Sequence, residues 1–166
     1  MKRRDVYNSQ KLFETTMAKK IKYTEEDLKN HDAVAVIIKD QSGRILIQNH
    51  AKYGFWTIPI GKVKSGQTCK EGMKEEVFEE CNLILEKFDE IGSREYVYER
   101  DGKMVKLTLH LYETTKYSGE LSNKEPHKHK EQLFMPLAEI KKIPYLSDST
   151  LLFLELRGYK RKANLE

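Results

Sequence analysis

The chain has 166 residues, of which 39% are hydrophobic and 34% are charged. This length and composition predict one domain with a hydrophobic core and exclude a disordered chain. The formal net charge of +4 suits a small anionic substrate but is too low to indicate nucleic-acid binding by itself. The longest apolar run, residues 33–38, is too short to span a bilayer, and no apolar run follows the basic N-terminus. We therefore expect a cytoplasmic protein with no membrane partner, whose two cysteines are free thiols.

The first 30 residues are polar and mixed in charge, and they predict an N-terminal extension with one short helix. The packed domain is expected over residues 31–166. Residues 33–39 are rich in β-branched side chains and predict a buried strand. Residues 40–44 have turn composition, and residues 45–48 predict the returning strand.

A loop with Gly and Pro precedes a predicted helix over residues 68–81. Thr68 is the expected N-cap, and Glu71 three positions later completes a capping box. Asn82 is the expected left-handed C-cap.

Alternating strands in residues 93–115 flank Asp101-Gly102, which predicts a β-hairpin with a two-residue turn. Residues 131–140 predict a strand that runs into a short helix or turn.

Residues 148–160 predict a closing amphipathic helix capped by Asp148 or Ser149. Strands, a central helix, more strands and a final helix indicate an α/β fold whose mixed sheet is covered on both faces.

The predicted central helix carries three glutamates, Glu76, Glu79 and Glu80, at a spacing that places them on one face. Their mutual repulsion would disappear if they held a divalent cation, and Mg²⁺ suits such a carboxylate site. The alternative is a solvated helix face on which Lys70 and Lys74 pair with the glutamates.

The loop before this helix supplies groups that could hold an anion. Gly61 and Gly66 allow the main chain to approach a ligand closely, and Lys62 and Lys64 add positive charge. Carboxylates, a metal and a basic loop together indicate hydrolysis or transfer at phosphorus.

Residues 61–83 resemble the Nudix box, G-x5-E-x7-R-E-U-x-E-E-x-G-U, in which U is an aliphatic residue. Gly61, Glu76, Glu79 and Glu80 match the box, as do the aliphatic residues Val77 and Leu83. The preceding WTIPIG, residues 56–61, is similar to the W-x-x-P-x-G segment common in the family.

The resemblance implies a single-domain Nudix-type α/β/α sandwich that hydrolyses a nucleoside diphosphate linked to a moiety X, with Mg²⁺ or Mn²⁺. Glu79 and Glu80 would be metal ligands, and Glu76 would be a ligand or the base that activates water. The carbonyl of Gly61 would complete the metal site. Glu131 is the candidate for an extra carboxylate from a later loop, although it also suits a surface position.

Three positions depart from the box. Gln67 replaces a glutamate, Glu75 replaces an arginine, and Asn82 replaces a glycine. Gln67 lacks a charge, and Glu75 cannot orient its neighbours as the arginine does and adds repulsion. These changes leave an alternative open, which is a weak or inactive Nudix-like module that binds a nucleotide or RNA.

The segment that leads into the box, from Trp56 onward, resembles the corresponding segment of diadenosine polyphosphate hydrolases and of RNA 5′-end pyrophosphohydrolases. A dinucleoside polyphosphate is therefore the expected substrate, and an RNA 5′ end is the alternative; DNA is not expected. Lys62 and Lys64 would contact phosphates, and Trp56 and Tyr98 would contact a base. Packing in the core or at its rim also explains Trp56, and a place in the strand alternation EYVYE also explains Tyr98. We expect a monomer or a homodimer.

Two basic segments have plainer explanations than a binding site. His127 and His129 lie in an HKHK stretch, which is expected to be a solvated loop. Residues 157–162, RGYKRK, could touch RNA but are expected to form a solvated tail.

Overall fold

The computed structural model describes residues 30–100 and 102–160, together with the side chains of all of these except residues 30, 98 and 100. The predicted helix in residues 1–29 and the last residues of the predicted tail lie outside this range. The elements in chain order are β1 (Asn30–Ile37), β2 (Ile45–His50), β3 (Trp56–Thr57), β4 (Ile60–Lys62), α3 (Cys69–Cys81), β5 (Ile84–Arg100), β6 (Lys103–Ser118), β7 (His129–Met135), α4 (Leu137–Ile140) and α5 (Asp148–Leu156). No helix in the described part is long and apolar enough to cross a membrane.

The strands form two sheets. The first is mixed and has the order β4-β1-β6-β5, in which β1 runs parallel to β6 and antiparallel to β4. The second is antiparallel and has the order β3-β2-β7. Residues 33–38 are completely buried because β1 is an inner strand with a hydrophobic core on each face.

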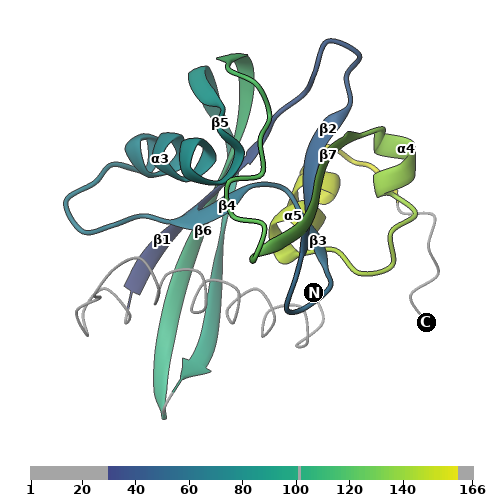
Figure 1. Ribbon diagram of the computed structural model, residues 1–166. Helices are drawn as coiled ribbons and strands as arrows, with labels where there is room; N and C mark the ends of the chain where they lie inside the picture. The colour runs from purple at the N-terminus through teal and green to yellow at the C-terminus, as the bar shows by residue number, and fades with distance from the viewer. Residues whose placement is uncertain (1–29, 101, 161–166) are drawn as a thin grey trace.

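Helices cover both faces of the first sheet (Figure 1). Val34 and Val36 of β1 pack in one core with Met73 and Val77 of α3. Ala33, Ala35 and Ile37 point to the other face and pack with Leu152 and Phe153 of α5. The expected α/β/α sandwich with a mixed sheet is therefore confirmed.

The predicted returning strand is present as β2, but it does not pair along β1. After β1 the chain forms one isolated antiparallel bridge between Lys39 and Ile45. Strand β2 then pairs with β7 in the second sheet. Residues in β2 contribute to both cores, since Ile45 and Ile47 pack toward α5 while Leu46 packs toward α3.

The hairpin β5–β6 is longer than the sequence pattern predicts. It begins at Ile84 and not at residue 93, and its strands are paired down to Arg100 and Lys103 around the expected turn. Register shifts near Leu85, Lys87 and Glu90 interrupt the alternation of polar and apolar residues, so the early part does not look like a strand in the sequence. The far half of the hairpin projects beyond α3 and the second sheet (Figure 1).

The predicted cap of α5 is wrong by one or two residues. Ser147 is the N-cap, and its side-chain oxygen accepts a hydrogen bond from the backbone N–H of Thr150 at 3.3 Å. The hydroxyl of Ser147 also donates to Oγ1 of Thr57 at 2.8 Å, and Oγ1 of Thr150 accepts from the backbone N–H of Ile58 at 3.0 Å. These buried bonds attach α5 to the segment that leads into Gly61.

Candidate active site

Glu76 of α3 lies directly against Gly61 of β4. A Cβ atom added at Gly61 would lie 2.2 Å from Cγ and 2.6 Å from Cδ of Glu76, which is far inside van der Waals contact. Glu76 is only 2% exposed. A glycine at position 61 therefore makes the space in which this carboxylate lies.

The helix that carries the glutamates is capped as its sequence predicts. Thr68 and Glu71 form the capping box, and Asn82 is a left-handed C-cap with φ of 62°. Glu80 is 2% exposed, and Glu79, one residue earlier, is half-buried. The alternative of a solvated helix face is therefore wrong for Glu76 and Glu80.

A fourth carboxylate comes from the loop before β7. The backbone N–H groups of Ser122 and Lys124 donate to the carbonyls of Cys81 and Glu80, at 3.0 and 3.3 Å, and hold this loop against the end of α3. Glu125 follows, is mostly buried, and forms an ion pair with Lys128.

Cys81 has three carboxylates around it. Burial raises the pKa of its thiol well above the usual value, and the negative charges of Glu80, Glu76 and Glu125 raise it further. The same three carboxylates therefore share one buried region at the end of α3.

The two charge-altering departures from the box contact each other. Nε2 of Gln67 donates to Glu75 at 2.6 Å, and the ammonium of Lys64 forms an ion pair with the same carboxylate. The bond to Lys64 lowers the pKa of Glu75, against partial burial, and the bond to Gln67 lowers it further. The expectation that Glu75 only adds repulsion is wrong, because two partners stabilise its charge.

The carboxyl groups of Glu75 and Glu79 also lie close enough to share a hydrogen bond. Glu75 therefore belongs to the same carboxylate group as the box residues.

The other predicted substrate contacts are dispersed. Lys62 is 3% exposed, in β4 beside Gly61. Trp56 is partly buried and packs against the core under α5, as the plainer explanation expects. The backbone of Tyr98 pairs with Val105 in the hairpin, but its side chain lies outside the described part of the structure.

Glu131 is exposed in β7, next to Gln132. Gln132 faces α3, because its Nε2 donates to the carbonyl of Glu80 at 3.1 Å. Successive side chains of a strand point to opposite faces, so Glu131 points away from α3. Glu125, in the loop that is bonded to the end of α3, is the later carboxylate that lies near this helix, and no periodicity in the sequence links a loop residue to it.

The prediction of a solvated HKHK loop is correct for His127 and wrong for its neighbours. His127 is exposed, whereas Lys128 is 7% and His129 is 3% exposed. The ring of His129 packs edge-on against the ring of buried His50, with 6.2 Å between the ring centroids, and Lys128 forms an ion pair with Glu125. The segment is therefore part of the wall beside the carboxylates.

This set of donors fits a hard divalent cation. Carboxylate oxygens are the ligands that Mg²⁺ and Mn²⁺ prefer. Glu76 and Glu80 are buried, Glu125 is mostly buried, and all three act on the same thiol of Cys81. Carboxylates gathered in this way favour a bound cation. Glu79 adds a more accessible carboxylate from the same helix.

Comparisons with known proteins identify the family and the fold. The NUDIX domain family model matches residues 29–153. A search of curated proteins found no match. Among solved structures, a MutT NUDIX hydrolase from Burkholderia pseudomallei is 22% identical with a TM-score of 0.66, and the alignment covers 77% of this chain and 98% of that one.

Two further structures were solved with ligands or as complexes. The NUDIX domain of Shewanella oneidensis NrtR, complexed with ADP ribose, is 13% identical with a TM-score of 0.63, covering 82% of this chain and 92% of that one. An Ap4A hydrolase from C. elegans, solved as a binary complex, is 20% identical with a TM-score of 0.52, covering 80% of this chain and 100% of that one. At these identities the likeness shows a shared fold, and the family match over most of the chain shows that it belongs to the Nudix family, whose members hydrolyse nucleoside diphosphates linked to another moiety.

Proposed function

We propose that this chain is an active, Mg²⁺- or Mn²⁺-dependent nucleotide pyrophosphohydrolase, and that a dinucleoside polyphosphate is its best substrate. The observation that carries the proposal is the buried carboxylate group of α3, with Glu76 and Glu80 each 2% exposed and Glu76 placed against Gly61. Burial of like charges is costly, and a merely structural helix gains nothing from it.

Glu76, Glu79 and Glu80 would hold the divalent cation, with the carbonyl of Gly61 and, from the loop, Glu125. When bound, the cation would neutralise phosphate charge and lower the pKa of a bound water. Glu76, fixed by its contact with Gly61, is the best placed base to take a proton from the attacking water. Lys62, beside Gly61, would contribute positive charge toward the phosphates.

Lys64 has a different role in this proposal. Its ion pair with Glu75 compensates the two departures from the box, so it holds the loop in place and does not contact phosphate. This arrangement favours an active enzyme over the binding module, since the altered residues form a paired cluster at the start of the helix.

The test is hydrolysis of a nucleotide panel with Mg²⁺ and with Mn²⁺, with products separated by chromatography. The panel contains diadenosine tetraphosphate, ADP-ribose, NADH, nucleoside triphosphates and a 5′-triphosphorylated RNA. We expect turnover that Glu79→Gln lowers by roughly a hundredfold or more, which corresponds to about 3 kcal/mol of lost transition-state stabilisation. No turnover by a folded protein, together with thermal stabilisation by a nucleotide, would instead indicate a binding module.

Two matched variants in the same assay locate the extra carboxylate. Glu125→Gln is expected to reduce the rate at least tenfold, whereas Glu131→Gln leaves it within twofold of the parent. A larger loss of rate in Glu131→Gln than in Glu125→Gln would show that the loop rearranges to bring Glu131 to the helix.

A further inference from the structure

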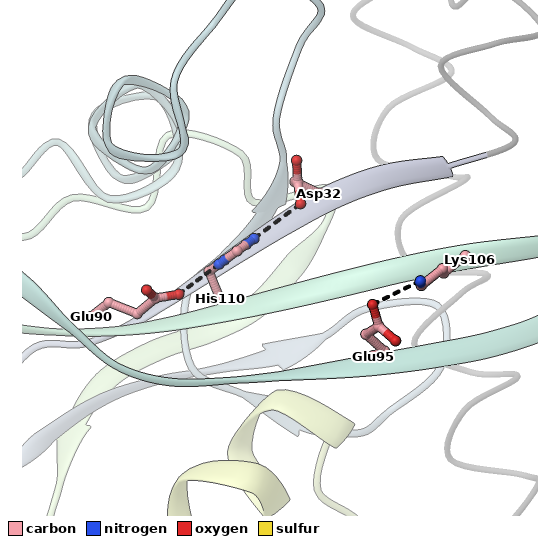
Figure 2. A network of polar contacts seen from close by, with 5 residues as sticks. All are labelled: Asp32, Glu90, Glu95, Lys106 and His110. Atoms are coloured by element: carbon pink, nitrogen blue, oxygen red, sulfur yellow. Dashed lines mark hydrogen bonds and ion pairs between the residues drawn. The ribbon is translucent and has the colours of Figure 1, made fainter.

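A second group of side chains, of the types that ligate metals, lies on the α3 side of the first sheet near the other end of the helix. Asp32 of β1, His110 of β6 and Glu90 of β5 form a row across three neighbouring strands (Figure 2). Nδ1 of His110 lies 2.6 Å from Oε1 of Glu90, and Nε2 lies 3.0 Å from Oδ1 of Asp32. The imidazole ring is therefore held in one orientation from both sides.

Cys69, the first residue of α3, completes the group. One ligand atom from each of Asp32, Cys69 and His110 lies within 4.8 Å of the others. Cys69 also shares a hydrogen bond with Tyr112, two residues along β6 from His110. Ten residues of helix, about 15 Å, separate Cys69 from Glu79, so this group is distinct from the carboxylates of the Nudix box.

An ion-pair network would explain why the two carboxylates lie beside His110. It would not explain why the sulfur of Cys69 lies within 4.8 Å of the same groups. Two acidic partners on a partly exposed histidine contribute little to stability, because solvent screens such pairs. The network gives His110 the arrangement found in metal-ligating histidines, in which one ring nitrogen donates to a carboxylate and the other faces the metal. Glu90 is that carboxylate, and Nε2 is the nitrogen that faces Asp32. The sulfur of Cys69 completes the set of ligand atoms that lie within 4.8 Å of one another.

We propose that Asp32, Cys69 and His110 form a Zn²⁺-binding site, with Glu90 orienting the histidine and water as the fourth ligand. Nitrogen, sulfur and one carboxylate oxygen are the donors that favour zinc over magnesium. On binding, the Cys69 thiol and the protonated Nε2 each release a proton to solvent, and the metal takes their place. The Asp32 side chain is 51% exposed, so an ion can reach the site from solvent.

Co²⁺ is the probe for this site, because a bound thiolate gives Co²⁺ an intense sulfur-to-metal absorption that carboxylates cannot give. The titration uses the full chain carrying Glu79→Gln, which weakens binding at the Nudix carboxylates. We expect one equivalent of Co²⁺ to produce the sulfur band with the strong visible absorption of tetrahedral cobalt, and Zn²⁺ to abolish both. The result does not depend on hydrolysis, so it is independent of the proposed function.

Variants separate the ligands from their surroundings. Cys69→Ser is expected to abolish the sulfur band, and His110→Gln to weaken Co²⁺ binding at least tenfold. Glu90→Gln should weaken binding 10- to 100-fold while the band persists. Glu95→Gln is the matched control, because Glu95 pairs with Lys106 at 2.8 Å on the same hairpin and should leave Co²⁺ binding unchanged (Figure 2).

Two results would overturn the proposal. One is a folded Glu79→Gln chain that gives no sulfur band with Co²⁺. The other is a band that survives Cys69→Ser, since the thiol would then be Cys81. Serine is well tolerated in the first turn of a helix, and a far-ultraviolet circular dichroism spectrum of Cys69→Ser that matches the parent's would show that loss of the band is not loss of the fold.

Discussion

Glu75 shows at the scale of single residues how a box can change and keep its charge balance. The Nudix pattern places Glu and Arg at positions 67 and 75, whose charges sum to zero. Here positions 67 and 75 carry a net charge of −1, and the positive Lys64, which is bonded to both Gln67 and Glu75, balances it. Comparing each position with the box separately does not reveal this compensation, because Lys64 lies at a variable position of the box.

The contact between Gly61 and Glu76 gives the sharpest prediction for one residue. Gly61→Ala places a methyl group 2.2 Å from Cγ of Glu76, so the carboxylate must move. A displacement of about 1 Å can cost on the order of a hundredfold in rate. We expect the hydrolysis rate to fall by at least tenfold, measured beside thermal unfolding to show that the variant is folded.

Gly72→Ala is the matched control for this change. Its added methyl group would lie 3.2 Å from the end of the Gln67 side chain and in ordinary contact with Val63, at 3.4 Å from Cγ2 and 3.6 Å from Cα, and alanine favours a helix. Its rate should stay within about threefold of the parent. Equal losses in the two variants would mean that the contact with Glu76 is not what matters.

At the scale of elements, prediction succeeded where the signal is local. The capping box at Thr68, the C-cap at Asn82 and the turn of the hairpin depend on residues a few positions apart, and all are present. The pairing of β2 and the length of β5 were not predictable, because they depend on distant strands and on bulges. Burial of Glu76 and the approach of Glu125 also depend on tertiary packing.

The cap of α5 can be tested by mutation. Ser147 accepts from Thr150 and donates to Thr57, and all three side chains are buried. Ser147→Ala removes the cap and leaves a buried partner unpaired, so the free energy of unfolding should fall by about 1–3 kcal/mol. Urea denaturation measures this loss.

Ser149→Ala, in the same hydroxyl cluster, is the comparison. Ser149 is not the cap, and it lies 3.0 Å from the hydroxyl of Ser147. We expect a smaller loss than for Ser147→Ala. A larger one would mean that the buried hydroxyl cluster, and not the cap, dominates the loss of stability.

At the scale of the whole molecule, the buried wall beside the active site makes stability depend on pH. His50 is 2% exposed, is stacked on Tyr53 and Phe55, and accepts from the backbone N–H groups of Lys52 and Tyr53 through Nδ1. Burial, with the charges of Lys52 and Lys128, lowers its pKa from 6.5 to about 4. The folded protein therefore holds this histidine neutral in a range where the unfolded chain protonates it.

The direction of the effect follows from proton linkage. Between pH 6.5 and 4 the unfolded state binds more protons at this site, so the stability that neutral His50 contributes is full above pH 6.5 and declines as pH falls toward 4. The difference in pKa corresponds to a loss on the order of 3 kcal/mol across this window. Asparagine keeps an acceptor in the place of Nδ1 but does not titrate, so His50→Asn should be less stable at pH 7 yet lose less stability on acidification. Urea denaturation at several pH values measures both slopes, with exposed His127→Gln as the control, and a His50→Asn slope as steep as the parent's would assign the pH dependence to other groups.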